Sequence, residues 1–190
     1  MRTVNQSRRA ACGFNSTAAN AGLSVSEFSA AGTPLSASAY TGGGLAQPTS
    51  LAIDASGRVH VANFGDNSLT ILVGGSTPGA CSTPAQAGQT GCPLSPAGGY
   101  TGGGQSGTNL IAIDGAGRSW ITNYHGDSIT EMGSDGSALS PATGYAPGEL
   151  SQPYGIAVDA SGNLWVANFG SNTVTQFIGI AVPVSTPLLP

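Results

Sequence analysis

The chain has 190 residues, enough for one domain with a hydrophobic core, and only 7% of them are charged. Its formal net charge is −4 and it contains no lysine and no basic stripe, which excludes nucleic acid as an expected partner. No apolar run approaches the roughly 20 residues that a membrane-spanning helix needs, so no membrane span is expected.

Residues 1–20 are polar, carry three of the five arginines and show no hydrophobic periodicity. They lack the apolar stretch of a secretion signal and are predicted to form a disordered leader. A recognisable pattern begins near residue 21, because residues 23–36 align with the end of a unit that recurs later in the chain.

One segment occurs three times without a gap, over residues 48–72, 108–132 and 153–177. The last copy has the sequence PYGIAVDASGNLWVANFGSNTVTQF. Its short runs are rich in β-branched and aromatic residues and are bounded by Gly, Asn, Asp and Ser, a pattern typical of consecutive antiparallel strands joined by tight turns. Such an internal repeat indicates an array of small sheets and predicts a β-propeller.

The expected fold is therefore all-β, with about three full four-stranded blades plus part of a fourth over residues 21–179. The fourth strands are expected near residues 33–36 and 138–140, and the apolar, Pro-rich tail 180–190 can add at most one edge strand. Because propellers usually have about four to eight blades, we expect the C-terminal portion of a larger propeller. The alternatives are an irregular four-bladed ring and a small protein that closes by dimerisation.

The cysteines are Cys12, Cys81 and Cys92, and the last two lie in an insertion at residues 75–92. Cys81 and Cys92 bracket a stretch rich in Gly, Pro, Ala and Gln, which favours a disulfide that closes a surface loop; two free thiols are the alternative. Cys12 has no predicted partner. The disulfide and the Gly/Ser/Thr-rich composition favour a secreted or periplasmic location.

An aspartate ends the first strand of every copy and opens a D-x-x-G turn. These residues are Asp54, Asp114 and Asp159. The carboxylate can accept a hydrogen bond from the backbone N–H two residues later, and the glycine can adopt a positive φ, so the aspartates are predicted to be structural. Calcium would need several converging oxygen ligands, which one aspartate per blade does not supply. No metal and no cofactor are expected.

His60, Trp120 and Trp165 occupy one equivalent position in the second strand of the unit. Since side chains alternate between the two faces of a strand, the tryptophans are predicted to fill space between blades. His60 is then a polar substitute at the same place, and a ligand-binding role is its alternative.

The second strand of every copy ends in an asparagine followed by an aromatic residue. The asparagines are Asn63, Asn123 and Asn168. The favoured interpretation is that each side chain caps the following turn by hydrogen bonding to the backbone. If these turns instead face a central channel, the asparagines offer neutral donors and acceptors for sugar hydroxyls or peptide groups. Tyr124, His125 and Tyr154 are then further ligand-binding candidates.

No catalytic residue is predicted. His125 replaces a glycine of the other copies, but a lone histidine without a second histidine, a paired glutamate or a serine nucleophile is weak support for acid–base chemistry. The motifs G-x-S-x-G and H-E-x-x-H and a phosphate-binding loop are missing from the sequence.

The units PYGIAVDASGNLWVANFGSNTVTQF and PTSLAIDASGRVHVANFGDNSLTIL resemble NHL repeats. Similar units build the virginiamycin B lyase (streptogramin lyase) propellers. The resemblance covers about residues 23–177 and implies a propeller, usually of about six or seven blades, with ligands bound at the mouth of the channel.

The lyases of this family use histidines in P-H-G/A-I segments, a glutamate after the second-strand aromatic run, and magnesium. This chain has Thr49 or Tyr154 at the histidine position and asparagines at the glutamate position, so the catalytic groups do not carry over. The resemblance then implies a non-catalytic scaffold that binds a protein, peptide or carbohydrate at the channel face. The alternative is a divergent lactonase-like enzyme or a virginiamycin B lyase-like carbon–oxygen lyase, with its active site in missing blades. Open blade edges also allow self-association.

Overall fold

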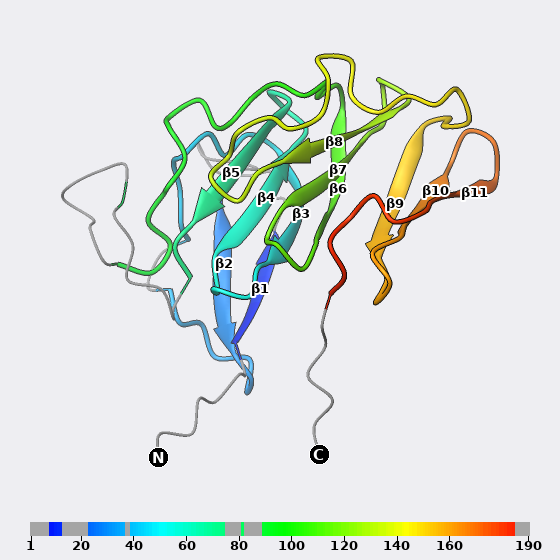
Figure 1. Cartoon of the computed structure of the whole chain (residues 1–190). Coiled ribbons are helices and arrows are strands. Elements are labelled where there is room, and N and C mark those ends of the chain that lie inside the picture. Colours follow the sequence, from blue (N-terminus) through cyan, green and yellow to red (C-terminus); the bar gives the residue numbers. More distant parts are fainter. Residues whose placement is uncertain (1–7, 13–22, 37–38, 75–80, 82–88, 185–190) are drawn as a thin grey trace, which may run out of the picture.

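The computed structural model describes residues 8–12, 23–36, 39–74, 81 and 89–184 (Figure 1). All regular structure in these residues is antiparallel β, in one two-stranded and three three-stranded sheets. None of the described residues forms a helix long and apolar enough to cross a membrane.

Each sheet is one blade, and the blades are numbered along the chain. Blade 1 pairs β1 (Arg8–Cys12) with β2 (Val25–Ser29). Blade 2 contains β3 (Pro48–Ile53), β4 (Val59–Asn63) and β5 (Ser68–Leu72). Blade 3 contains β6 (Thr108–Ile113), β7 (Ser119–Asn123) and β8 (Ser128–Met132). Blade 4 contains β9 (Pro153–Val158), β10 (Leu164–Asn168) and β11 (Thr173–Phe177).

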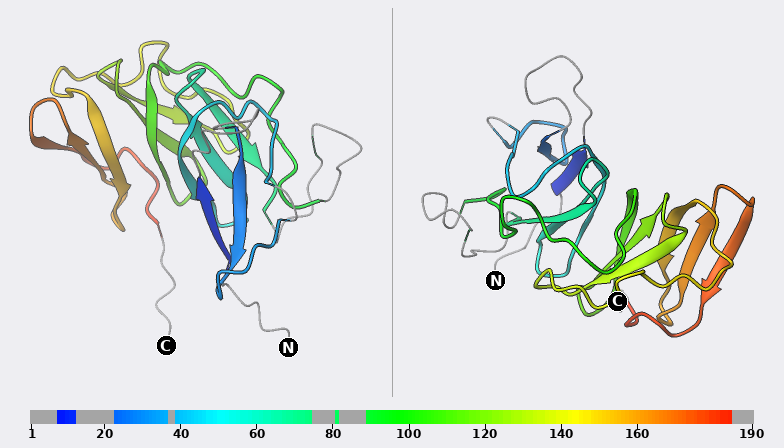
Figure 2. Two further views of the ribbon diagram at one scale, coloured as in Figure 1. Left: turned by 180° about the vertical axis from the view of Figure 1, so that it is seen from behind. Right: turned by 90° about the horizontal axis from the view of Figure 1, so that it is seen from above.

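The blades follow one another side by side. β1 contacts β3, β3 contacts β6, and β6 contacts β9. Seen from above, the blades lie along an arc with blade 1 and blade 4 at its two ends (Figure 2). The predicted all-β arrangement of repeated propeller blades is therefore confirmed.

The turn between the first and second strands is built as the sequence predicts. In blade 2 the backbone N–H groups of Ser56 and Arg58 donate to Asp54 Oδ1 at 3.0 and 2.8 Å. Gly57 then has a φ of 83°, which an L side chain rarely adopts. Asp114 and Asp159 make the corresponding pairs of bonds in blades 3 and 4.

In blades 1, 2 and 3 the fourth strand is shorter than predicted. In place of strands at residues 33–36 and 138–140, the structure has isolated bridges such as Phe28–Pro34 and Met132–Ala138. Proline has no N–H to extend a ladder, and Ser and Gly bend these segments away after one or two bonds. The outermost position is therefore occupied by a loosely paired edge.

The structure also places a strand inside the predicted leader. Arg8–Cys12 form β1, which pairs in register with β2 from Arg8–Ser29 to Cys12–Val25. The expectation of disorder does not hold for these five residues, because β2 needs a partner for its backbone N–H and C=O groups. The rest of segment 1–20 lies outside the described residues.

Most of the insertion 75–92 also lies outside the described residues, but its two cysteines do not. Cys81 and Cys92 form the predicted disulfide, with their Cα atoms 5.8 Å apart. Cys92 is buried beside the end of β5, where its carbonyl accepts a hydrogen bond from the N–H of Val73. The insertion is thus tied to blade 2 at its C-terminal end.

The hydrophobic core is divided among the contacts between blades. We call the face of a blade that is turned toward the next blade its leading face, and the opposite face its trailing face. Between blades 2 and 3, the leading-face residues Ala62, Leu69 and Ile71 pack on the trailing-face residues Ile111, Ile121 and Met132. Two further clusters join blades 1 and 2 and blades 3 and 4 in the same way. Every covered leading face therefore packs against an apolar trailing face.

Candidate binding site

The first strand of each blade starts with an irregular register. In β3, Pro48 pairs with Asn63 and Ser50 with Ala62, which leaves Thr49 as an extra residue. β6 and β9 shift at the same place, next to Asn109 and Tyr154. A bulge re-aims the side chain it carries, so these three equivalent residues leave the alternation of their strands.

The asparagine at the end of each second strand holds the neighbouring chain in place. Asn123 Oδ1 accepts from the N–H of Ser106 at 3.3 Å, and its Nδ2 donates to Ser128 Oγ and Thr130 Oγ1, both at 2.9 Å. Asn63 and Asn168 make the corresponding three bonds. All three asparagines are buried and have their amide groups engaged inside the blade. The amides are therefore engaged inside the blade, but with the connection before the first strand and with hydroxyls of the third strand, not with the backbone of the following turn as predicted.

The aromatic residue that follows each asparagine is positioned by the same connection. The backbone N–H of Tyr124 donates to the carbonyl of Gly107 at 2.9 Å. Phe64 and Phe169 bond in the same way to Gln47 and Gln152, both at 3.1 Å. The three aromatic rings are thereby presented next to the bulged residues of the first strands.

Together these two repeat positions form a hollow of about 320 Å³. It is lined by Thr49, Asn109 and Tyr154 from the bulges and by Phe64, Tyr124 and Phe169 from the turns. Each of blades 2, 3 and 4 thus supplies one residue of each kind. The rings of Tyr124, Tyr154 and Phe169 contact one another, with centroids 6.3 to 6.4 Å apart.

Three polar side chains of this hollow make no hydrogen bond within the described part of the protein, whereas the hydroxyl of Thr49 donates to the carbonyl of Asn109 at 2.7 Å. Within the described part of the chain, the hydroxyls of Tyr124 and Tyr154 and the amide of Asn109 have no hydrogen-bonding partner, although Asn109 is 7% exposed. The other three tyrosines of the chain, at positions 40, 100 and 145, each donate to a carboxylate or carbonyl. The hollow therefore combines aromatic surface, neutral polar groups and a lining without charge.

His125 lies at the rim of the hollow rather than in its lining. Its ring packs edge-on against Phe64 and Tyr124, with both centroid distances 5.4 Å. It therefore bridges the aromatic residues of blades 2 and 3. The nearby Asp127 accepts from the N–H of Gln152 at 2.6 Å, so this carboxylate supports the connection into blade 4.

The structure brings together some of the sequence candidates and adds others. Tyr124 and Tyr154 line the hollow, His125 touches it, and the three asparagines hold the connections behind it. Sequence reasoning missed Thr49, Phe64, Asn109 and Phe169 as lining residues. The repeat itself could have revealed them, because all six lining residues occupy two positions of the unit: the second residue of its first strand and the residue after its second strand.

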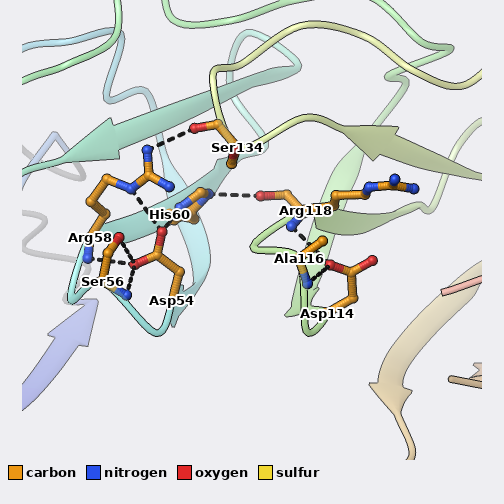
Figure 3. A network of polar contacts seen from close by, with 9 residues as sticks. Asp54, Ser56, Arg58, His60, Asp114, Ala116, Arg118 and Ser134 are labelled. Atoms are coloured by element: carbon orange, nitrogen blue, oxygen red, sulfur yellow. Dashed lines mark hydrogen bonds and ion pairs between the residues drawn. The ribbon is translucent and has the colours of Figure 1, made fainter. Parts of the chain in front are cut away.

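A second cluster of polar groups lies between blades 2 and 3 (Figure 3). His60 contacts Ser119 Oγ through Nδ1 at 2.8 Å and Asp54 Oδ2 through Nε2 at 3.3 Å. Burial raises the pKa of Asp54, but hydrogen bonds from His60, Ser56 and Arg58 outweigh it and hold that pKa well below the usual range. The combination of Ser, His and Asp is that of a hydrolase, yet the serine and the histidine are both 0% exposed. No substrate reaches this hydroxyl, and the cluster joins the two blades.

The repeat explains why a histidine occupies this position. Trp120 Nε1 donates to Asp114 at 3.2 Å, and Trp165 Nε1 donates to Asp159 at 3.0 Å. His60 Nε2 thus takes the place of an indole N–H, as a polar substitute for the tryptophan. Elsewhere in the described residues, no three His, Cys, Asp or Glu side chains are grouped so that they could hold a metal ion.

Comparison with known proteins gives one match to a sequence family. Residues 150–177, which contain all of blade 4, match the NHL repeat. This segment is an NHL repeat. A search of curated protein sequences found no match to the chain.

Similar solved structures support the same fold. A streptogramin B lyase has 15% sequence identity and a TM-score of 0.53, with 88% of this chain and 50% of that one covered. A gluconolactonase from Xanthomonas campestris has 16% identity and a TM-score of 0.53, covering 82% and 44%. The calcium-binding protein regucalcin from Agrobacterium tumefaciens has 17% identity and a TM-score of 0.53, covering 85% and 54%.

At these low identities the structural likeness establishes a shared propeller fold and no shared activity or ligand. The chain spans about half the length of the structures that it matches. The resemblance to NHL-type propellers is therefore confirmed for the repeat and for the fold.

Proposed function

We propose that this chain is a non-catalytic scaffold that binds a neutral ligand in the aromatic hollow. The observation that carries the proposal is the pair of tyrosine hydroxyls, Tyr124 and Tyr154, that lack a protein partner beside exposed aromatic rings. Sites for small ligands combine apolar and aromatic walls with a few free polar groups that set orientation.

The chemistry of the lining points to a glycan or an uncharged stretch of peptide. Both present hydroxyl or amide groups to neutral donors and acceptors, and both have apolar surfaces that pack on aromatic rings. A carboxylate or phosphate ligand is disfavoured because the lining residues carry no positive charge. The Cys81–Cys92 disulfide supports a location outside the cytoplasm, secreted or periplasmic.

The proposal is tested by titrating the chain with maltohexaose, cellohexaose, chitohexaose and an uncharged Gly/Ser/Asn/Tyr peptide in a calorimeter. We expect at least one probe to bind, and Tyr154→Ala and Phe169→Ala to weaken its binding about fivefold or more, since stacking on an aromatic ring is worth ~1 kcal/mol or more. Tyr154 and Phe169 are 50% and 65% exposed, so both variants should fold.

The matched control is Leu139→Ala, because Leu139 is 47% exposed but lies at the outer edge of blade 3. The affinity of this variant for the probe should equal that of the unsubstituted chain. Failure of all four probes to bind, or equal losses in the control and hollow variants, would contradict the proposal.

The alternative is a lyase-like or lactonase-like propeller enzyme. The similar structures include a streptogramin B lyase and a gluconolactonase, at 15% and 16% identity. The hollow here is lined by no histidine, carboxylate or lysine, which are the usual groups for proton transfer. Turnover of gluconolactone or of a cyclic depsipeptide lactone, lost in Tyr154→Phe, would favour the enzyme over the scaffold.

A further inference from the structure

The chain leaves the third strand of blade 4 differently from the other blades. In blades 1, 2 and 3 a later segment returns along the outer edge of the third strand, at the bridges Phe28–Pro34, Leu72–Pro93 and Met132–Ala138. After β11 the chain instead runs back past β9 toward blade 3 (Figure 1). Among the described residues, no segment pairs with the outer edge of β11. We call the crossing residues, 181–184, the strap.

Backbone hydrogen bonds hold the strap on two neighbouring turns. The N–H of Ala181 donates to the carbonyl of Gly162 in blade 4 at 3.0 Å. The N–H of Val182 donates to Asp114 Oδ2 in blade 3 at 3.1 Å, and the carbonyl of Val182 accepts from the N–H of Gly115 at 3.0 Å. Ala181 is buried in the hydrophobic cluster between the two blades. The strap therefore clamps blade 4 to blade 3.

Blade 3 differs from its two sister copies at the place where the strap crosses it. Gly115 stands where the other copies have Ala55 and Ala160. A Cβ at residue 115 would lie 2.0 Å from the carbonyl oxygen of Pro183, which is closer than real Cβ contacts. The strap therefore needs the glycine that only this copy has.

The aspartate of the same turn is adapted as well. In blades 2 and 4 the Oδ2 atom of the turn aspartate accepts from the side chain four residues later, which is Arg58 or Asn163. The residue at this place in blade 3, Arg118, donates to Glu131 instead, at 2.7 Å. The N–H of Val182 donates to the aspartate in its place. Two features of one turn thus fit the strap, so its position on blade 3 is specific.

The strap nevertheless has the sequence of a fourth strand. In blades 1 and 3 the bridged residue comes six positions after its partner in the third strand, as Pro34 does after Phe28. The same count from Phe177 leads to Pro183. The three residues that start at this position are PLS at 34–36, PLS at 93–95, ALS at 138–140 and PVS at 183–185. The register therefore makes this segment the counterpart of the fourth strands.

One residue explains why the segment does not return along β11. In blades 1, 2 and 3 a glycine precedes the residue that closes the returning turn, and Gly32, Gly91 and Gly136 have φ values of 80°, 79° and 85°. A Cβ on Gly91 or Gly136 would also lie 2.0 or 2.4 Å from a tyrosine ring of the preceding blade. Blade 4 has Ala181 at this place. Its methyl group disfavours the turn through both the positive φ and the lack of space.

We propose that the strap has two positions and that the methyl group of Ala181 selects between them. In the position that the structure shows, the strap clamps blade 3 to blade 4 and leaves the edge of β11 unpaired. In the other position Val184 pairs with Gln176, as Leu139 pairs with Glu131 in blade 3, and the clamp is released.

The two positions exclude each other because both use the carbonyl of Val182. On blade 3 this carbonyl accepts from Gly115, and in a returning turn it would accept from Ile178, as the carbonyl of Ser137 accepts from Gly133. An open edge at β11, which can pair with another strand, is thereby coupled to a closed clamp. The proposal does not depend on what the aromatic hollow binds.

Amide hydrogen exchange, followed residue by residue by NMR, distinguishes the two positions. In the unsubstituted chain we expect slow exchange at the N–H of Gly115 and fast exchange at that of Val184. Gly115→Ala should raise the exchange rate at Val182 about tenfold or more, because its methyl group displaces the strap. The turn itself should persist, since blades 2 and 4 build it with an alanine at this place.

The double variant Gly115→Ala with Ala181→Gly should move the strap to its other position. Exchange at the N–H of Val184 should then slow about tenfold or more relative to Gly115→Ala alone, because this N–H gains a partner in β11. The control is Ala55→Gly, which makes the reverse exchange at the same turn position in blade 2. It should leave the exchange rates at Val182 and Val184 unchanged.

Fast exchange at Gly115 in the unsubstituted chain would overturn the proposal, because the clamp would then be missing. Fast exchange at Val184 in the double variant would overturn it as well, because no fourth strand would have formed. Equal changes at Val182 in Ala55→Gly and Gly115→Ala would do the same. Retained circular dichroism of each variant shows that a change in exchange is not a loss of folding.

Discussion

Blades 3 and 4 are two copies of one sequence unit in different surroundings. Trp120 and Trp165 make the same hydrogen bond to the aspartate six residues earlier, yet one is 0% and the other 41% exposed. Ile129 and Val174 differ in the same way, at 0% and 65%. The local structure of a blade is therefore set by the unit itself, whereas the burial of its leading face depends on whether another blade follows.

The largest expected difference between the two blades concerns these tryptophans. Trp120→Ala should lower the free energy of unfolding by about 3–5 kcal/mol, because it empties space between two packed blades. Trp165→Ala should cost less than about 1 kcal/mol when measured on dilute protein, where its face is open. Urea unfolding of both variants checks this, and equal losses would show that the leading face of blade 4 is covered within a single chain.

Replacing one buried glutamine should stabilise the protein. Gln105 occupies the position of Leu45 and Leu150 in the connections into blades 2 and 4, and both of its side-chain polar atoms are buried without a partner among the described residues. Gln105→Leu should raise the free energy of unfolding by about 1–3 kcal/mol, because it removes two buried polar atoms that have no hydrogen-bonding partner. Thermal unfolding measures the effect. The reverse change, Leu150→Gln, is the control and should destabilise.

The aspartates of the turns should differ in how strongly they couple stability to pH. Hydrogen bonds hold the pKa of Asp54 well below the usual range despite burial, and in blade 4 they do the same for Asp159. A depressed pKa contributes stability that is fully present above the unfolded pKa of about 4 and is lost as the pH falls toward the folded value.

At neutral pH, Asp54→Asn should therefore lower the free energy of unfolding by about 1–2 kcal/mol. The difference in this free energy between the variant and the unsubstituted chain should shrink between about pH 5 and pH 2. Asp159→Asn should show the same sign with a smaller difference, because water screens the exposed blade. Unfolding in urea at several pH values measures both. A difference for Asp54→Asn that widens in acid would contradict the assignment.

The smallest expected effects come from exchanging single methyl groups. Ile129→Val should cost about 1 kcal/mol, since it leaves a small void between blades 3 and 4. Val174→Ile should change the free energy of unfolding of the dilute protein by less than about 0.5 kcal/mol, because the added methyl group faces water. Chemical unfolding again provides the measurement, and a clear cost at Val174 would indicate a tightly packed environment there.

Much of the fold could be predicted because its determinants are local. The Asp54 turn, the alternation in β4 and the disulfide between Cys81 and Cys92 each depend on residues close together in sequence. The fourth strands were predicted too long and β1 was missed, because both depend on whether an edge finds a partner. Nothing in the composition of Arg8–Cys12 shows that β2 will supply one.

The candidate site was predicted only in part, and the physical reason is the bulge. An extra residue at the start of each first strand turns Thr49, Asn109 and Tyr154 away from simple alternation. Their meeting with Phe64, Tyr124 and Phe169 then requires three blades to stand side by side. Tyr124 and Tyr154 were among the predicted candidates, whereas Phe64 and Phe169 were not.

By itself, the sequence determined the repeated unit, its three strands and its turns, since hydrogen bonds within about 25 residues hold each blade together. Only the tertiary structure decided which side chains face the hollow and which blade is left open. Those outcomes depend on contacts between blades, such as Trp120 against blade 4, that join residues from separate copies of the unit. Trp120 and Trp165 occupy the same place in their units, so the difference in their burial follows from the blade 4 residues that pack against Trp120.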